Sequence, residues 1–276
     1  MPEGPEVQVV ISTLQQQLTH ACIQDVEIRM DKLIQNMEPE TFARALKGQS
    51  FRRFYRIGKY LGFETDDYDW IVHLRMEGKF YIYKENPDID SHVHAVFYLE
   101  DGRILCYHDT RKFGRMALYP KAQHKRSLPV FAKIGKDFRD PSVDPRELYR
   151  HLHRSNRPLK AALLDQSILA GIGNIYADEI CFACGLDPRS RCCRVSRKDC
   201  ENIVQAMHEI MERAVAAGGT TIRSYTSSLG ITGLFQLDLD VHGKKGQPCP
   251  VCQRPIDKIV VAQRGTYLCR HCQKRK

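Results

Sequence analysis

Four cysteines near the C-terminus constrain the fold of this 276-residue chain more than any other feature. They are spaced C-x2-C-x16-C-x2-C and are Cys249, Cys252, Cys269 and Cys272. In this spacing each C-x2-C turn offers two thiolates to one tetrahedral zinc ion. Two strands around a tight turn are predicted between the pairs, with Arg264-Gly265 near the tip. Such a short hairpin is unstable alone, so we expect one structural zinc to supply its folding energy.

The remaining cysteines predict no disulfide framework. Seven of them are scattered along the chain, and an odd total of eleven with a cytosolic profile argues against pairing. Cys181 and Cys184 form a second C-x2-C pair, but it lies on an expected helix with no strand before it. We therefore interpret this pair as core-facing or incidental, and not as redox-active.

The overall composition predicts a folded cytoplasmic protein. Hydrophobic residues make up 42% of the chain and charged residues 27%, close to the average of globular proteins. No apolar run is long enough to cross a bilayer, and the N-terminus lacks the plan of a secretory signal. We expect no membrane partner, and we expect a monomer because nothing in the sequence demands an oligomer.

Positive charge is concentrated at the C-terminal end. The formal net charge is +9, and residues 242–276 hold nine Lys or Arg residues against one acid, Asp257. A basic module on a nearly neutral body is typical of proteins that bind nucleic acids. Lys258 and Arg264 are the residues expected to touch the nucleic acid. Arg270 and the tail 274–276 are expected to add unspecific attraction.

The first half of the chain is rich in strands. Helical spacing of apolar residues predicts a helix that ends near Thr19, followed by a strand at 26–30 and a short helix at 39–46. Between Phe51 and Tyr119 six short strand-like stretches follow one another, which suggests a β-sandwich or barrel. They are YLGFET, WIVHLRM, KFYIY, HAVFYL, RILCYH and RMALY. The predicted N-terminal domain covers 1–132, and a linker follows at 133–143.

Beyond this linker the periodicity is helical. Three helices are predicted near 146–153, 159–166 and 174–184. A long fourth helix has Ser196 as its N-cap and Gly218-Gly219 as its stop. The helices form a predicted domain at 144–241, and the zinc hairpin forms a module at 242–276. The fold class is therefore α+β and multidomain.

The N-terminal sequence MPEGPEV has an ordinary and a chemical interpretation. Pro5 and Glu6 are typical of the first turn of a helix, and Pro2 permits removal of Met1. Once Met1 is removed, however, Pro2 presents a secondary amine, which no other standard residue offers. An amine that attacks a sugar C1′ carbon displaces the base and forms a Schiff base. A free α-amine titrates near pKa ~8, so a neutral fraction exists at cellular pH.

Seven motifs in order resemble the bacterial formamidopyrimidine-DNA glycosylases, also called Fpg or 8-oxoguanine DNA glycosylases. They are MPEGPEV, RIGKYL at 56–61, HLRMEG at 73–78, DTRKFG at 109–114, GIGNIYADE at 171–179, GGTT at 218–221 and the QRGT of the zinc hairpin. The resemblance spans essentially the whole chain. It implies a β-sandwich, a helix-two-turn-helix domain and a zinc hairpin, with a lesion-capping loop at about 220–235.

The resemblance also implies an activity and its catalytic residues. The chain is expected to be a bacterial, nucleoid-associated glycosylase and AP lyase that removes oxidised purines from double-stranded DNA. Pro2 would form the Schiff base that leads to β,δ-elimination, and Glu3 would shuttle protons to the opening sugar ring. Lys59 would assist near the lesion, although an exposed lysine at a strand end is its ordinary interpretation. Arg264 would contact the phosphates of the lesion.

Further DNA contacts are implied by the same resemblance. Met76 and Phe113 would fill the gap left by the flipped nucleotide, and Arg111 would read the orphaned base. Met76 is otherwise interpreted as a core residue and Phe113 as sandwich packing. Asn174 and backbone N–H groups beside it would hold a phosphate; the ordinary interpretation of Asn174 is a simple helix cap, and the two are compatible. Other implied contacts are His92, Lys258 and, more weakly, Glu6 and Glu77.

Two other functions remain open at this point. An endonuclease VIII type of glycosylase shares the nucleophile but prefers oxidised pyrimidines, and the RKFG sequence favours the first type. A non-catalytic zinc-ribbon protein that binds DNA would have no use for an N-terminal amine. Two positions depart from the family pattern: Ser155 stands where some members have a DNA-binding lysine, and His242 stands where a tyrosine is common.

Overall fold

The structure, a computed structural model, describes residues 1–84, 89–220 and 238–276, which group into two units. The sandwich unit contains Met1–Pro2, Glu6–Ala132 and the described part of Gly218–Gly233. The helical unit contains Glu3–Pro5, Lys133–Ala217 and the described part of Leu234–Lys276. The predicted domain limits stay predictions, because such units need not coincide with domains that fold independently.

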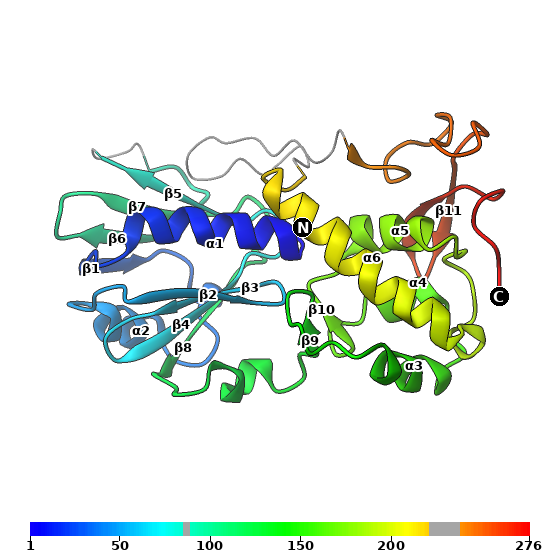
Figure 1. The fold of residues 1–276 in the computed structure, drawn as a ribbon. Helices are drawn as coiled ribbons and strands as arrows, with labels where there is room; N and C mark the ends of the chain where they lie inside the picture. Colours follow the sequence, from blue (N-terminus) through cyan, green and yellow to red (C-terminus); the bar gives the residue numbers. More distant parts are fainter. Residues whose placement is uncertain (85–88, 221–237) are drawn as a thin grey trace. The chain divides into compact units, whose positions relative to one another are not determined.

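Two four-stranded sheets form the sandwich unit (Figure 1). The first sheet has the order β1 (Ile23–Ile28), β6 (Val93–Leu99), β7 (Ile104–His108) and β5 (Lys79–Tyr83). The second has the order β2 (Arg53–Ile57), β3 (Tyr60–Glu64), β4 (Tyr68–His73) and β8 (Arg115–Pro120). All neighbouring strands are antiparallel. The six predicted strands and the predicted sandwich are confirmed.

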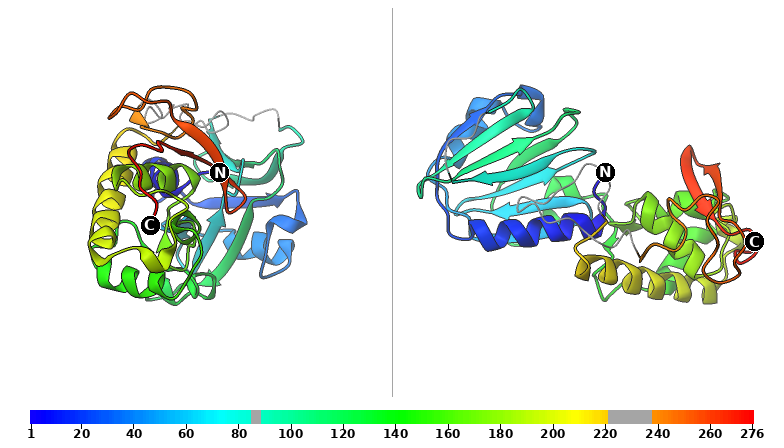
Figure 2. Two further views of the ribbon diagram at one scale, coloured as in Figure 1. Left: turned by 90° about the vertical axis from the view of Figure 1, so that its right-hand side faces the viewer. Right: turned by 90° about the horizontal axis from the view of Figure 1, so that it is seen from above.

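An apolar core joins α1 (Gly4–Leu18) to these sheets. The buried side of α1 consists of Val7, Val10, Ile11, Leu14 and Leu18, which recur every three or four residues. Figure 2 shows α1 running beside the strands. Trp70 lies in the same core, with ring centroids 4.6 Å from Phe97 and 4.7 Å from Phe63. Burial of each such side chain contributes about 2 kcal/mol, so the core holds α1 in place.

Some sandwich elements differ from the prediction. β2, with the sequence RFYRI, is missing from the predicted set because it lies at the edge of its sheet and its arginines, three positions apart, interrupt the alternation of a strand. β1 begins at Ile23, three residues before the predicted strand. The helix predicted at 39–46 is confirmed as α2 (Pro39–Leu46). Short 3-10 helices occur at Asp31–Leu33, Lys125–Ser127 and Pro129–Phe131.

The helical unit begins inside the segment predicted as a linker. Within 133–143, β9 (Lys136–Asp137) pairs in parallel with β10 (Leu169–Ala170), and Phe138 is fully buried in the core. The other helices are α3 (Pro145–His153), α4 (Leu159–Leu163), α5 (Asn174–Ala183) and α6 (Arg197–Ala216), with a 3-10 turn at Cys192–Arg194. The loose sequence pattern of 133–143 therefore conceals a packed segment.

The ends of the helices follow from specific side chains. Ser196 and Asp199 form a reciprocal capping box at the start of α6, as Ser196 predicted. α4 is three residues shorter than predicted, because the Asp165 carboxylate accepts hydrogen bonds from Ser167 and Arg157 and starts a turn. Cys181 lies buried on α5 and Cys184 caps its C-terminus, in agreement with a structural role.

The C-terminal hairpin consists of β11 (Asp257–Val261) and β12 (Arg264–Leu268). Its turn is Ala262-Gln263, with positive φ angles of 48° and 60°, as a two-residue type I′ turn requires. Arg264 therefore begins β12 directly after the turn, near the tip as predicted. The arrangement is favourable for presenting one basic side chain at a fixed place.

The basic tail is docked on the helical unit, and its predicted role as an unspecific attractor stays a prediction. Lys276 Nζ lies 2.6 Å from Asp199 Oδ2, and Arg270 pairs with Asp257. The backbone of the tail also bonds to the helical unit, since Asp187 N donates to Lys274 O at 2.9 Å. Partners on the protein therefore already neutralise part of this charge.

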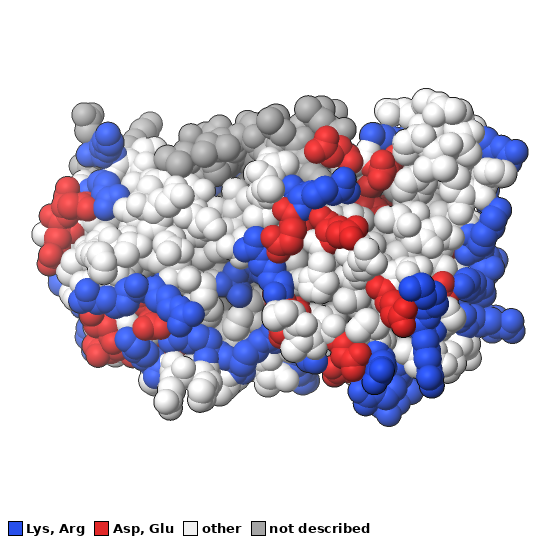
Figure 3. Space-filling view, viewed as in Figure 1, with Lys and Arg blue, Asp and Glu red and all other residues white. Residues whose placement is uncertain are grey.

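Charged side chains are unevenly distributed over the visible surface. On the face shown in Figure 3, Lys and Arg gather over α3 and along the edge of the helical unit that carries the C-terminus.

No helix within the described parts of the chain has the length and apolar character needed to cross a membrane.

Candidate functional site

Glu3 is held by the first turn of α5. Its carboxylate accepts hydrogen bonds from Ile175 N at 3.0 Å and from Tyr176 N at 3.4 Å, and its side chain is only 3% exposed. The adjoining Gly4 N donates to Gly171 O at 2.8 Å. The N-terminus of a helix favours a negative charge, so this geometry stabilises a carboxylate one residue after Pro2.

The glycine of GIGN that precedes α5 is required by this contact. A Cβ atom at Gly173 would lie 2.2 Å from Glu3 Cδ, closer than any real contact allows. The same geometry bears on the phosphate site predicted beside Asn174, which stays a prediction. Two of the backbone N–H groups expected to bind a phosphate, those of Ile175 and Tyr176, bind Glu3 instead.

Glu6 is the second buried acid of the N-terminal segment and belongs to the sandwich unit. Its Oε1 accepts hydrogen bonds from Thr220 N and Thr220 Oγ1, both at 2.9 Å, and its side chain is 4% exposed. Glu6 therefore fixes the residue at which the predicted capping loop begins. The remainder of that loop, 221–235, lies outside the described residues. Pro2 is buried, and its nitrogen is joined to Met1 in this chain.

Lys59 occupies the turn between β2 and β3. The pair Ile57–Tyr60 closes a two-residue turn in which Gly58 has a positive φ of 59°, a pattern typical of a type II′ turn. Lys59 is only 6% exposed, so its interpretation as an exposed lysine at a strand end is wrong. Lys59 therefore lies inside the turn and not on its solvent side.

His73 reflects the positive surroundings of this lysine. Burial lowers the pKa of His73 to about 3, and the nearby charges of Arg75 and Lys59 act in the same direction. The neutral ring accepts a hydrogen bond from Arg75 N to its Nδ1 at 3.0 Å. The imidazole thus helps to shape the turn that leads to Met76.

The turns that carry Met76 and Phe113 are brought together around Tyr107. A Cβ atom at Gly78 would lie 2.2 Å from the Tyr107 hydroxyl oxygen, and one at Gly114 would lie 1.6 Å from it. Both turns therefore approach this buried ring closely. Phe113 is 46% exposed, so its interpretation as sandwich packing is wrong.

The other predicted contacts of the sandwich unit lie near these turns in sequence. Arg111 and Phe113 form a cation–π pair, with the guanidinium carbon 5.0 Å from the ring centroid. Met76 and Glu77 are half-buried in the turn between β4 and β5. His92 is exposed, and its backbone oxygen accepts a hydrogen bond from Asp109 N at 2.9 Å.

In the helical unit, Asn174 and Arg264 are brought together at Gly265. Asn174 Nδ2 donates to Gly265 O at 3.0 Å, and Gly265 directly follows Arg264. Asn174 is the first residue of α5, and the N-cap is Gly173, so the interpretation of Asn174 as a simple helix cap is wrong. Lys258 Nζ lies 5.4 Å from the centroid of the Tyr267 ring across the hairpin.

A buried ion pair behind the hairpin is missing from the sequence-based prediction. Lys160 and Asp178 are both fully buried, with Lys160 Nζ 2.7 Å from Asp178 Oδ1. Lys160 Nζ also donates to Gly265 O at 3.1 Å and to Thr266 Oγ1 at 2.8 Å. Asp178 Oδ2 lies 2.8 Å from His242 Nδ1 and accepts from Tyr267 N at 3.1 Å. The only signal in the sequence was a charge inside the apolar stretches LKAALLD and NIYADEI.

A neighbouring acid, Glu179, holds the segment that leads into the zinc module. Its carboxylate accepts the N–H groups of Asp240, Val241 and His242 at 2.8 to 3.1 Å. Burial raises the pKa of Glu179, and these backbone hydrogen bonds oppose that rise. Through Asp178 and Glu179, α5 fixes both the hairpin and its approach.

The four cysteines of the C-x2-C pairs converge on one point. Their Sγ atoms all lie within 4.8 Å of one another, with 3.8 Å between Cys249 and Cys272 and 3.5 Å between Cys252 and Cys269. Tetrahedral zinc with bonds of about 2.3 Å requires sulfur atoms about 3.8 Å apart. The N–H group of Arg254 lowers the pKa of Cys252 to about 7, which favours the thiolate. The donor set therefore fits one structural zinc ion.

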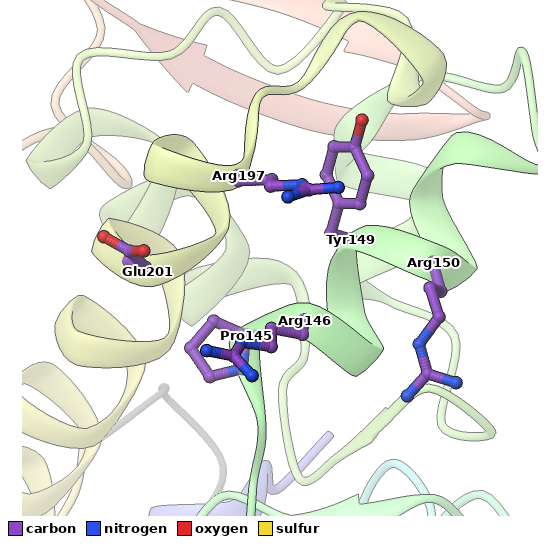
Figure 4. Close-up of a pocket in the computed structure, with 6 residues that line it drawn as sticks. All are labelled: Pro145, Arg146, Tyr149, Arg150, Arg197 and Glu201. Carbon is purple, nitrogen blue, oxygen red and sulfur yellow. The ribbon is translucent and has the colours of Figure 1, made fainter.

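Two cavities are lined by side chains other than those of the predicted site. One in the sandwich unit has a volume of about 210 Å³ and is lined by Tyr60, His73 and Arg75 among others. One in the helical unit has a volume of about 540 Å³ and lies between α3 and α6 (Figure 4). Its lining is Pro145, Arg146, Tyr149, Arg150, Arg197 and Glu201. None of the predicted site residues lines either cavity.

Comparison with known families covers nearly the whole chain. Residues 1–116 match the formamidopyrimidine-DNA glycosylase N-terminal domain. Residues 134–226 match the formamidopyrimidine-DNA glycosylase H2TH domain, and residues 246–275 match the zinc finger found in FPG and IleRS. The zinc prediction is confirmed by the last match together with the cysteine geometry, and the chain holds one structural zinc ion.

Individual relatives align with this chain over their full length. The formamidopyrimidine-DNA glycosylase of Bacillus licheniformis is 40% identical over 276 residues, covering 100% of both chains. That of Bacillus subtilis is 41% identical over 278 residues, with the same coverage. The Lactococcus lactis Fpg in complex with DNA containing an abasic site has a TM-score of 0.92 and 34% identity, covering 99% of this chain and 100% of its own. This chain therefore belongs to the formamidopyrimidine-DNA glycosylase family.

Proposed function

We propose that this chain removes oxidised purines, namely 8-oxoguanine and formamidopyrimidines, from double-stranded DNA and cuts the strand at the resulting site. Membership of the family makes the chain a DNA glycosylase of base-excision repair. The Lactococcus relative has been solved with DNA containing an abasic site or an N7-benzyl-Fapy-dG lesion. The proposal assigns the chemistry to Pro2, Glu3, Lys59 and Arg264.

The observation that carries this proposal is the binding of Glu3 to α5. Two N–H groups of α5 bind the Glu3 carboxylate next to Pro2, and the glycine at position 173 leaves room for it. A helix-opening acid needs no such arrangement at a neighbouring helix. A fixed proton carrier next to an amine is what Schiff-base chemistry on a sugar requires.

The proposed reaction starts when Met1 has been removed. Pro2 N attacks the sugar C1′ atom, and the bond from C1′ to the base breaks with its electron pair, so the base leaves after taking up a proton. The nitrogen then gives its proton to the Glu3 carboxylate, and its lone pair opens the ring to an iminium while Glu3 passes that proton on to O4′. Loss of a C2′ proton expels the 3′ phosphate, and a second elimination expels the 5′ phosphate.

Lys59 and Arg264 supply positive charge in this proposal. The developing and leaving groups of both eliminations are anionic, so a buried ammonium and a fixed guanidinium lower their free energy. Arg264 is placed by the turn of the hairpin and by the Gly265 carbonyl, to which Asn174 Nδ2 and Lys160 Nζ donate. The zinc ion has no part in these steps; it keeps the hairpin folded.

DNA contacts outside the chemistry complete the proposal. Met76 and Phe113 enter the gap left by the flipped nucleotide, and Arg111 reads the orphaned base. His92, Asn174 and Lys258 bind phosphates, while Glu6 and Glu77 lie close to the base. The exposure of Phe113 and the cation–π pair that it makes with Arg111 support the wedge role. We place this activity in the bacterial cytoplasm, on nucleoid DNA, since the matched relatives are bacterial.

Borohydride trapping tests the proposal. Reduction during turnover of an 8-oxoguanine duplex should join the protein covalently to DNA, and this adduct should disappear in the Pro2→Gly variant, which lacks the secondary amine. Mass spectrometry should place the adduct at residue 2. An adduct at an internal lysine refutes the proposed nucleophile. Faster reaction with thymine glycol than with 8-oxoguanine favours the endonuclease VIII alternative, and no adduct at all favours a protein that only binds DNA.

A further inference from the structure

Asp109 begins the loop DTRKFG and is fully buried. Its Oδ1 accepts a hydrogen bond from Arg111 N at 3.0 Å. Its Oδ2 accepts from Phe113 N at 2.9 Å and from Gly114 N at 2.8 Å. One side chain therefore satisfies three of the backbone N–H groups of the loop 109–114, which we call the wedge loop.

The backbone of Asp109 is also fixed at both ends. Its N–H donates to His92 O at 2.9 Å, and its carbonyl oxygen lies 2.8 Å from His94 Nε2. Lys112 N donates to the same carbonyl oxygen at 3.2 Å. Asp109 is thus anchored in the sheet, and the wedge loop is wrapped around its carboxylate.

The side chains of the wedge loop have little packing of their own. Arg111, Lys112 and Phe113 are all exposed, and Phe113 and Arg111 contact each other. Lys112 has a φ of 58°, in the left-handed region that a lysine rarely adopts. A strained, exposed loop keeps one conformation only if other contacts impose it, and the three N–H bonds to Asp109 are such contacts.

We propose that Asp109 is a positioning residue for base flipping: it holds the wedge loop in the conformation in which Arg111 and Phe113 enter the duplex. This inference rests on the wedge role given to these two residues in the proposed function. Asp109 itself touches neither the sugar nor the base in this proposal. Its loss therefore slows the opening of the duplex and leaves the chemistry at C1′ unchanged.

The test compares two substrates in single-turnover experiments. The first is an 8-oxoguanine duplex, in which flipping precedes chemistry. The second is a single strand with an abasic site, in which there is no base to flip and no pair to break. Because only the fraction of molecules with an ordered wedge loop is competent, we expect Asp109→Ala to slow the first reaction roughly 10- to 100-fold. The second rate should stay within about threefold of the unchanged protein.

A direct probe of flipping accompanies these rates. The fluorescence of 2-aminopurine placed beside the lesion rises when its stacking is lost. In Asp109→Ala this rise should slow in the same proportion as the reaction on the duplex. Asp109→Asn is the second variant, because its amide keeps the shape but turns a donor toward the N–H groups of the loop. It should show the same selective loss, roughly 3- to 10-fold, and it decides the question if the alanine variant does not fold.

Asp69 provides the matched control. It is a fully buried carboxylate of the same unit that accepts hydrogen bonds from Tyr55 Oη at 2.9 Å and Ala122 N at 2.8 Å. Asp69→Ala should lower both rates equally, through the fraction of folded protein, or lower neither. Equal loss of both rates in the Asp109 variants, or no loss, overturns the inference alone. A wild-type protein that gives no adduct with the duplex overturns the proposed function and this inference with it.

Discussion

The wedge loop and the zinc hairpin both present an arginine on a short segment, but they are held in different ways. Arg111 sits on a loop whose backbone binds one buried carboxylate, that of Asp109. Arg264 sits on a hairpin held by a metal site and by a buried ion pair that reaches it from α4 and α5. The carboxylate that binds the wedge loop comes from within five positions of the N–H groups it accepts, whereas the hairpin depends on residues about a hundred positions away.

This difference predicts how each segment fails. Loss of one local acceptor loosens the wedge loop and leaves the surrounding sheets intact. Loss of a long-range partner leaves a buried charge unpaired, which destabilises everything packed around it. The single tryptophan, Trp70, lies in the core of the sandwich unit, so its fluorescence reports that unit alone.

Removal of zinc should have the largest effect. A structural zinc contributes about 10 kcal/mol or more to the folding of a small module, so the hairpin should unfold without it. We expect DNA affinity to fall roughly 100-fold or more, because Lys258 and Arg264 lose their positions. The measurement is DNA binding after verified zinc loss, with Trp70 fluorescence as the control, which should not change. Undiminished affinity would show that the hairpin is dispensable for binding.

The substitution Lys160→Met should have the next largest effect. It leaves the fully buried Asp178 without its ammonium partner, which should lower the free energy of unfolding of the helical unit by about 3 kcal/mol. Urea unfolding followed by far-UV circular dichroism measures this change. Lys125→Met is the matched control, because Lys125 pairs with Glu64 and Asp69 but is 14% exposed. Asp69 keeps its hydrogen bonds from Tyr55 Oη and Ala122 N, and water can replace the ammonium beside Glu64, so we expect a loss of about 1 kcal/mol. Equal losses of unfolding free energy in the two variants would show that burial of the ion pair makes no difference.

Acid should affect the sandwich unit through His73, with an intermediate effect. Burial lowers the pKa of His73 from 6.5 to about 3, so the unfolded chain binds a proton more readily between these values. The contribution of this neutral ring is complete above about pH 6.5 and is lost as the pH falls toward 3, by about 1.4 kcal/mol per pH unit. Urea unfolding followed by Trp70 fluorescence at pH 6.5 and 5 measures the slope. His73→Asn keeps an acceptor near Arg75 N and should reduce the slope; an unchanged slope assigns it to other groups.

Backbone strain should give the smallest effects and allows both segments to be compared directly. Gln263 in the hairpin turn and Lys112 in the wedge loop have φ angles of 60° and 58°. Glycine relieves each strain but costs unfolded-state entropy, so Gln263→Gly should stabilise the helical unit by about 0.5 kcal/mol. Lys112→Gly should leave stability within about 0.5 kcal/mol but slow flipping, because its loop has fewer contacts. Thermal unfolding measures the stability of both variants, and the 2-aminopurine signal measures their flipping rates. Slower flipping in Gln263→Gly but not in Lys112→Gly would contradict the prediction.

Local features of the fold were predictable from the sequence. The periodicity of α1, the capping residue Ser196 and the cysteine spacing all depend on neighbours in the chain, and the structure confirms each of them. The family resemblance is confirmed as well, because its motifs occur in order along the whole chain. The assigned roles of Pro2, Glu3, Lys59, Arg264 and the DNA contacts stay predictions.

Long-range pairing was not predictable by these rules. Nothing near Glu3 indicates that its carboxylate binds α5, some 170 residues later. Lys160 and Asp178 are ordinary charges in sequence, and only tertiary packing shows that they neutralise each other behind Gly265. The tail 274–276 has a charge pattern typical of a loose basic end, yet Lys276 forms an ion pair with Asp199 on α6. A pattern of charges gives the sign of a surface but not the partner that each charge already has.

The fit between Glu3 and Gly173 also bears on how this sequence is free to drift. The Glu3 carboxyl group fills the space that a methyl group at position 173 would need, so the residues acceptable at positions 3 and 173 depend on each other. Mutations at either position should be tolerated only in matched pairs. In a library that randomises both sites together, recovered active clones should show this dependence, even though each site alone looks like an unremarkable turn.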